Sequence, residues 1–156
     1  MKKKHLYIIS IIIVIILVIG YFLLQPKNGV MICTYNSKED NMVVEMKYEI
    51  TFKDKIVTNL NAKEVITSSD IKMLEEYKET LDMIYSFYND LKHYNVDVLI
   101  KDKSLITSAV INYKKLKKED IVKIDPSNSN LYKGDKVPLA KLKNKYKNNG
   151  AKCKYI

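Results

Sequence analysis

The sequence predicts an α+β domain with a mostly antiparallel sheet, preceded by one N-terminal transmembrane helix. Three observations predict this architecture. They are an apolar run over residues 6–24, an apolar and polar alternation of period two over residues 42–53, and an apolar stripe at helical spacing over residues 71–93. The expected order of elements is β-β-β-α-β-β-α-β, with the helices packed on one face of the sheet.

The N-terminal run is apolar apart from Ser10 and Gly20, and three lysines at residues 2–4 stand before it. At about 1.5 Å per residue, a helix over this run is roughly 28 Å long, close to the hydrocarbon thickness of a bilayer. Because lysines favour the cytoplasmic side of a membrane, the remainder of the chain should face outward. The expected segments are a cytoplasmic basic tip (1–5), a signal-anchor helix (6–24), a linker (25–29) and an extracytoplasmic domain (30–156).

Two other interpretations of this segment stay open. A cleaved signal peptide needs small residues after the apolar run, and residues 21–27 offer none at the required spacing. A lipoprotein signal needs a cysteine soon after the apolar core, and Cys33 comes nine residues after Leu24. We therefore expect a single uncleaved membrane span, with the domain in the cell envelope.

Three strands should open the exported domain. In residues 42–53 the side chains alternate between apolar and polar, which is typical of a strand with one buried face. A short turn leads to a second strand over residues 56–67, and a shorter strand over residues 30–35 precedes both. On the second strand, Thr58, Leu60, Ala62 and Ile66 are expected on one face.

One long helix and a second hairpin should follow. Ser68, Ser69 and Asp70 are candidates for the N-cap of a helix over residues 71–93. Its predicted apolar stripe, which should cover the sheet, consists of Leu74, Tyr77, Leu81, Ile84, Tyr88 and Leu91. Alternation predicts strands over residues 96–100 and 104–113, followed by a short helix over 117–123 and a loop over 125–134.

A last helix and strand should complete the fold. Pro138 suits the first turn of this helix and Gly150 suits its end. In the final strand, residues 151–156, Cys153 shares a face with Ala151 and Tyr155.

The two cysteines, Cys33 and Cys153, bracket the exported domain. If the first and last strands are neighbours, the sulfurs can meet, and thiols outside a membrane can stay oxidised. A bridge would close a loop of about 120 residues and stabilise the fold by up to about 5 kcal/mol in the chain-entropy picture. The alternative is a pair of buried free thiols.

These patterns resemble those of the YehR-like lipoproteins, a family of small bacterial envelope proteins. The resemblance covers residues 30–156. It rests on the long hairpin with a Lys-Asp-Lys turn at residues 53–55, the helix that opens with Ser and Asp, the hairpin ending at residues 111–114, and the closing helix, glycine and strand. The resemblance implies an α+β fold and a lipid anchor, although an uncleaved helix replaces the lipid-modified cysteine here. The family has no established activity, so the resemblance implies no site residues.

The residues give no catalytic signature. His5 and His93 are isolated in the sequence, Ser68 and Ser69 are explained as helix caps, and Glu75, Glu76 and Glu79 lie on a solvated helix face. The domain has three glycines and no phosphate-binding loop. We therefore expect a protein that is not an enzyme and that uses no cofactor or metal. An enzyme stays an alternative that would need polar groups converging only in the folded chain.

Lysines dominate the composition. The chain has a net charge of +9, and all 27 of its basic residues are lysines, which an AT-rich genome would explain. Between residues 133 and 154 there are eight lysines and one acid. Like charges four residues apart slightly destabilise a helix, so an anionic partner would reduce the repulsion between these lysines. The predicted anionic-partner surface consists of Lys141, Lys143, Lys145, Lys147, Lys152 and Lys154.

Phospholipid headgroups and anionic cell-wall polymer are the expected partners for this surface. A protein partner is left open, and export argues against nucleic acid. A merely solvated lysine-rich surface is the competing interpretation.

The favoured function is a membrane-tethered, non-enzymatic binding module of the envelope. The alternative is a small-ligand carrier with a pocket between helix 71–93 and the sheet, which predicts unfilled apolar volume near Tyr48, Tyr77 and Tyr88.

Overall fold

The structure is a computed structural model that describes residues 13–15, 26–39 and 41–156. Residues 13–15 are helical, whereas the predicted cytoplasmic tip and the rest of the predicted anchor, 6–24, lie outside the described residues. In the part of the chain that is described, no helix has the length and apolar character needed to cross a membrane.

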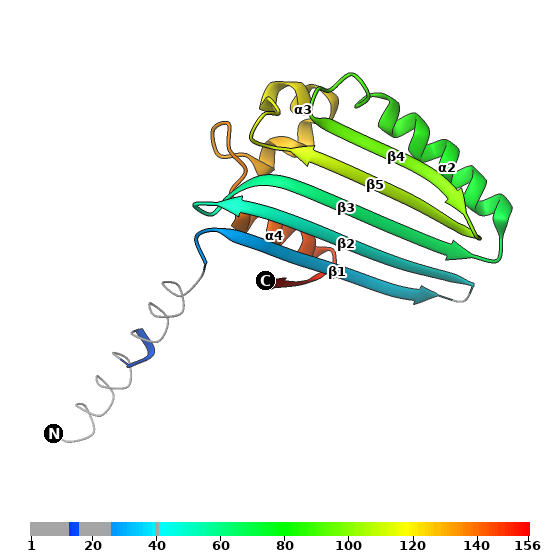
Figure 1. The fold of residues 1–156 in the computed structure, drawn as a ribbon, viewed down its shortest axis with the longest axis horizontal. Helices are drawn as coiled ribbons and strands as arrows, with labels where there is room; N and C mark the ends of the chain where they lie inside the picture. Colours follow the sequence, from blue (N-terminus) through cyan, green and yellow to red (C-terminus); the bar gives the residue numbers. More distant parts are fainter. Residues whose placement is uncertain (1–12, 16–25, 40) are drawn as a thin grey trace.

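The predicted α+β architecture is confirmed by a single six-stranded antiparallel sheet (Figure 1). The strands are β1 (Gly29–Glu39), β2 (Met42–Lys53), β3 (Ile56–Ser68), β4 (Tyr94–Lys101), β5 (Ser104–Asn112) and β6 (Lys152–Tyr155). Their order across the sheet is β4-β5-β3-β2-β1-β6. Both predicted hairpins are present, and the last strand pairs with the first, as the cysteine argument required.

The helices cover one face of this sheet. They are α2 (Ile71–Ser86), α3 (Lys118–Ile124), the 3-10 helix η1 (Pro126–Leu131) and α4 (Leu139–Asn148). Leu142 of α4 and Ile121 of α3 join Ile50 of β2 in one buried cluster. In Figure 1, α4 lies by β1 and β2, while α2 runs alongside β4.

The register explains this one-sided core. One row of paired residues crosses all six strands: Cys153, Cys33, Tyr48, Ala62, Ala109 and Val96. Because side chains alternate along each strand, residues two positions away face the same side. The opposite face carries charged and polar side chains such as Lys47 and Lys63, which are exposed.

The disulfide prediction is confirmed. Cys33 and Cys153 form a bond that links β1 to β6, with Cα atoms 4.0 Å apart. Cys33 is fully buried within the core cluster. The bond therefore links the first and last strands of the domain at one edge of the sheet.

The predicted face of β3 needs one correction. Leu60 and Ala62 do face the core, but Thr58 does not continue their face. The register between β2 and β3 shifts at Thr51 and Phe52, so that Phe52 pairs with Val57 and Thr58 becomes the extra residue of a bulge. Val57, which is 2% exposed, fills the core in its place.

The long helix is shorter than predicted, and its stripe is rotated. Asp70 is the N-cap as expected, since its Oδ1 accepts a hydrogen bond from the Met73 amide at 3.0 Å. The helix ends at Ser86, because the following residues are weak helix formers and form turns instead. Tyr77 and Ile84 are 49% and 44% exposed, so these two predictions were wrong; Tyr85 faces the sheet instead.

The predicted loop over residues 125–134 also contains more structure than expected. The Asp125 carboxylate accepts a hydrogen bond from the Ser127 amide at 2.9 Å, and Pro126 opens η1. Leu131, at the end of η1, is 9% exposed and belongs to the core.

Replacing Gly150 by alanine should destabilise the fold. Gly150 has a φ of 85°, and a Cβ there would lie 3.1 Å from Cε2 of the Tyr35 ring. Backbone strain and this contact together should lower the free energy of unfolding by about 1–3 kcal/mol. Gly134→Ala is the matched control, because its φ is 61° and no atom lies within 4 Å of the added methyl. Denaturant unfolding should show the larger loss for Gly150→Ala; equal losses would contradict the Tyr35 contact.

Candidate ligand-binding cleft

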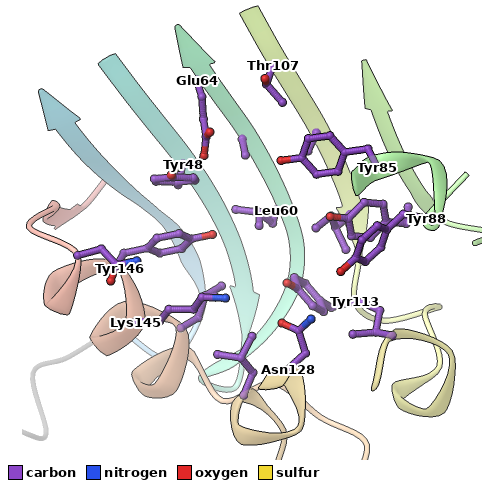
Figure 2. Close-up of a pocket in the computed structure, with 18 residues that line it drawn as sticks. Tyr48, Leu60, Glu64, Tyr85, Tyr88, Thr107, Tyr113, Asn128, Lys145 and Tyr146 are labelled. Atoms are coloured by element: carbon purple, nitrogen blue, oxygen red, sulfur yellow. Dashed lines mark hydrogen bonds between the residues drawn. The ribbon is translucent and has the colours of Figure 1, made fainter. Parts of the chain in front are cut away.

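A cleft of about 300 Å³ opens between α2, α4, η1 and the core face of the sheet (Figure 2). Six tyrosines line it: Tyr48, Tyr85, Tyr88, Tyr94, Tyr113 and Tyr146. Glu64, Lys145, Asn128 and Asn149 add polar groups, while Leu60, Ala62 and Ala109 belong to its apolar wall. A volume of this size falls at the small end of the range for ligand sites, which starts near 300 Å³.

Two stacked pairs of tyrosines form the sides of the cleft. Tyr48 of β2 stacks on Tyr146 of α4 with ring centroids 4.1 Å apart, and Tyr88 stacks on Tyr94 at 4.9 Å. In Figure 2, Tyr48 and Tyr146 lie on one side of the cleft, while Tyr85 and Tyr88 lie on the other. One side of the cleft is therefore built by β2 and α4, and the other side by β4 and the end of α2.

The secondary structure explains why these rings converge. Tyr48 occupies a core-facing position in the alternating strand β2, in the row that includes the disulfide. Tyr146 follows Leu142 by four residues and lies on the same buried face of α4. Tyr85 and Tyr88 lie at the end of α2, where the chain turns toward β4. The end of α2 and the face of α4 thus frame a strip of the sheet that neither helix covers.

One carboxylate belongs to this aromatic wall. The Tyr48 hydroxyl donates a hydrogen bond of 2.7 Å to Oε1 of Glu64, a half-buried residue of β3. Among the side chains that the structure describes, Glu64 forms no ion pair, and the other five cleft tyrosines donate no hydroxyl proton to a protein acceptor. Most of the polar groups of the cleft are therefore available to a ligand.

Burial raises the pKa of all six cleft tyrosines above the ordinary value of 10.0. For Tyr48, Tyr85, Tyr94 and Tyr146, the Glu64 carboxylate adds to this effect, because a negative charge disfavours a nearby phenolate. The cleft therefore presents neutral phenols over the whole physiological pH range.

These shifts predict instability in alkali. The unfolded chain ionises its tyrosines near pH 10, whereas the folded cleft resists ionisation until a higher pH. The contribution of these tyrosines to the free energy of unfolding should therefore be constant below about pH 10. It should fall as the pH rises above that value. Tyrosinate absorbance should show the cleft tyrosines ionising together with the loss of near-UV circular dichroism. Complete ionisation of the tyrosines in a chain that stays folded would contradict the burial of these phenols.

The predicted lysine surface is divided by the fold. The Lys141 ammonium donates hydrogen bonds of 2.8 Å to the carbonyl oxygens of Asn130 and Tyr132, where it fixes η1. The Lys143 ammonium lies 4.8 Å from the centre of the Tyr155 ring. Lys145 lines the tyrosine cleft, and Lys147 is exposed on α4.

Lys152 and Lys154 lie on the far side of the sheet. Both alternate with Cys153 and Tyr155, whose side chains face the core, so the two lysines point to the uncovered face. The structure therefore brings Lys143 and Lys147 together on α4 but does not gather all six lysines in one patch.

The small-ligand alternative expects a pocket between helix 71–93 and the sheet, and the cleft lies between the end of α2, η1, α4 and the sheet. Tyr48 and Tyr88 line the cleft, but Tyr77 points away from it. Sequence reasoning missed Glu64 and the tyrosines at 85, 94, 113 and 146. One signal was available, since Glu64 interrupts the apolar face that carries Leu60, Ala62 and Ile66. No group of three or more metal-ligating side chains occurs within the described ranges.

The fold and the cleft define a single α+β domain with an antiparallel sheet, whose helices cover one face and leave a cleft open between them. No family model and no curated protein matches the chain. Among solved structures, it is similar to the NMR structure of the Escherichia coli YehR protein, with a TM-score of 0.57 and 14% identity, over 85% of this chain and 95% of that one. An NMR structure of a protein from Streptococcus pneumoniae TIGR4 also matches, with a TM-score of 0.49 and 18% identity, over 83% and 87% of the two chains. The chain therefore has a YehR-like fold, as the sequence patterns predicted, and identity this low shows the fold alone.

Proposed function

We propose that this chain is a non-enzymatic, membrane-tethered binding protein of the cell envelope, and that the tyrosine cleft takes a small ligand. The observation that carries the proposal is the cleft itself. About 300 Å³ stays open beside the core, and six tyrosines and one carboxylate line this space. Tyrosine rings suit the apolar part of a ligand, and the five cleft hydroxyls that donate to no acceptor among the described residues suit its polar part.

The location in the envelope rests on two features of the sequence and the fold. The apolar run over residues 6–24 with its preceding lysines favours a membrane anchor. The disulfide between Cys33 and Cys153 fits an oxidising compartment outside the cytoplasm. Protease accessibility of the domain in intact cells would test this location.

Native mass spectrometry tests ligand binding directly. The full-length protein, purified in mild detergent from its own envelope, should carry a small bound mass. Ala109→Phe should abolish this mass, because the added ring would fill the cleft from β5 without touching the opposite face of the sheet. Val110→Phe is the matched control, since Val110 is 48% exposed on that opposite face. Absence of a bound mass in the native protein, or the same mass in Ala109→Phe, would contradict the proposal.

A second candidate surface is favoured by one observation. A second hollow, of about 340 Å³, is lined by Lys55, Lys143 and Lys147 together with Pro26, which is two residues beyond the predicted anchor. If residues 6–24 span the bilayer, these lysines lie near the lipid headgroups, where each basic residue can contribute about 1 kcal/mol on an anionic surface. We therefore propose anionic headgroups as the partner of this part of the lysine surface, with anionic wall polymer as the competitor for the same charges.

Hydrogen exchange can test this second candidate. In lipid nanodiscs containing anionic lipid, amides of α4 and of the turn at Lys55 should exchange more slowly than in zwitterionic discs. Replacing Lys55, Lys143 and Lys147 by glutamine should remove the difference, while replacing Lys63, Lys152 and Lys154 on the opposite face should leave it. Equal exchange in both lipids would overturn the headgroup contact.

A further inference from the structure

We propose that the tyrosine cleft recognises an alkylammonium group, held between the Glu64 carboxylate and the surrounding phenol rings. This inference rests on the cleft being a ligand site, as proposed above, and adds the chemical class of the ligand. Three features carry it: the unusual position of Glu64, the geometry of the rings around it, and the absence of a protein cation at this place among the described residues.

Glu64 is an acid on a core-facing position. In β3 it shares a face with Ala62 and Ile66, and across the sheet it pairs with Met46 and Thr107. It is the one acidic residue among the described residues that line the cleft. The side chain is half-buried on this face, where an apolar residue would satisfy the strand pattern better. The acid at this position therefore calls for a functional explanation.

The hydrogen bonds of Glu64 leave its charge without a counter-ion. The Tyr48 hydroxyl, 2.7 Å from Oε1, supplies a neutral donor. Within the described part of the chain, the two ion pairs join Lys72 with Glu76 and Lys78 with Asp82, both on α2. A ligand cation at Glu64 would provide the missing opposite charge.

The aromatic rings add to the attraction for a cation. The face of a phenol ring is negative, and a cation within about 6 Å of the ring centre is stabilised by roughly 0.5–2 kcal/mol, most strongly when it is desolvated. Tyr48 is hydrogen-bonded to Glu64 at 2.7 Å, and Tyr85, Tyr94 and Tyr146 line the same cleft. A cation beside Glu64 would thus meet several rings at once.

Lys145 does not supply this cation. Figure 2 shows Lys145 beside Asn128, at the end of the cleft away from Glu64. Its charge contributes, after the hydrogen bonds from Ser127, to lowering the pKa of the Asp125 carboxyl. Lys145 therefore lies at the Asn128 end of the cleft, and Glu64 has no ion-pair partner among the described residues.

A pair of isosteric probes separates charge from shape. Choline and 3,3-dimethylbutan-1-ol differ in that a carbon atom replaces the charged nitrogen. The full-length protein in neutral detergent should bind choline at least about tenfold more tightly than the alcohol. Binding can be followed by intrinsic tyrosine fluorescence, because the chain has 12 tyrosines and no tryptophan, and by calorimetry.

Two variants test the role of the carboxylate. Glu64→Gln keeps the size of the side chain and an acceptor for Tyr48, but should weaken choline binding at least about tenfold. Glu45→Gln, on the exposed opposite face of the sheet, should leave binding unchanged. Thermal unfolding would verify that both variants are folded.

Each outcome decides the inference. Equal affinity for the two probes, no binding of choline, or undiminished choline binding by Glu64→Gln would overturn the alkylammonium assignment. Binding of the neutral alcohol that disappears in Ala109→Phe would reject the charge preference while preserving the cleft as a ligand site. If the cleft were not the ligand site, the small mass bound to the natural protein would also be bound to Ala109→Phe.

Discussion

Replacing both Cys33 and Cys153 by alanine should lower the free energy of unfolding by about 3–5 kcal/mol. The bond closes a loop with a sequence separation of 120 residues, so the unfolded chain loses much freedom when the bond is present. Because small domains are stable by only about 5–15 kcal/mol, this loss is a large part of the total.

The effect should be concentrated at one edge of the sheet. β6 is a four-residue edge strand that pairs with β1 through residues 31–34, so the disulfide adds a covalent attachment to a short pairing. Once the bond is absent, β6 and the adjoining α4 should exchange their amide hydrogens faster than β3 and β5. The Tyr146 side of the cleft should become mobile with them.

Denaturant unfolding with and without reductant measures this prediction. Reductant should destabilise the natural protein by about the same amount and should leave the double variant unchanged. A double variant within about 1 kcal/mol of the natural protein would contradict a stabilising role for the bond.

Leu142→Ala should lower the free energy of unfolding by about 2–5 kcal/mol, because it creates a cavity in the core. Leu142 is 1% exposed and lies on α4, one turn before Tyr146. It contacts the core cluster and also lines the cleft, so its loss should both weaken the attachment of α4 and enlarge the ligand site.

Lys147→Ala is the matched control on the same helix. Lys147 is exposed and stands four residues from Lys143, so its removal should change stability by less than about 0.5 kcal/mol. Chemical denaturation of both variants provides the comparison. Similar stabilities for Leu142→Ala and Lys147→Ala would show that α4 is not held by its apolar face.

Much of the fold could be predicted because periodicity is a local property of the sequence. The alternation through Tyr48, Ile50 and Phe52 has one structural meaning, a strand with one buried face. The positions of Cys33 and Cys153 were compatible with neighbouring first and last strands, and the sheet shows that these strands do pair. Residues 54–55 and 102–103 form the turns of the two hairpins, and all four have a positive φ.

What could not be predicted depends on contacts between distant segments. The bulge at Thr58 follows from how β3 pairs with β2, and the pattern of β3 alone does not show it. The exposed faces of Tyr77 and Ile84 depend on how α2 lies against β4, since helical spacing allows several overlapping stripes.

The cleft was harder to predict than the fold, for a physical reason. Its tyrosines come from β2, β4, α2, α4 and the segment after β5, and no local pattern distinguishes a ring that fills a core from one that borders a cavity. The lysine run was conspicuous in the sequence, yet α4 and β6 direct its members to different faces. Glu64 was the one local anomaly that marked the site.

An experimental structure of the full-length protein purified from its native envelope would show whether the tyrosine cleft holds a ligand. We predict an open cleft with a bound small molecule between the Tyr48 and Tyr146 pair and the Tyr85 and Tyr88 pair, in contact with Glu64. Contact between the tyrosines of the two opposite sides, with α2 closed onto α4 and no volume between them, would contradict the proposal that this domain binds a ligand there.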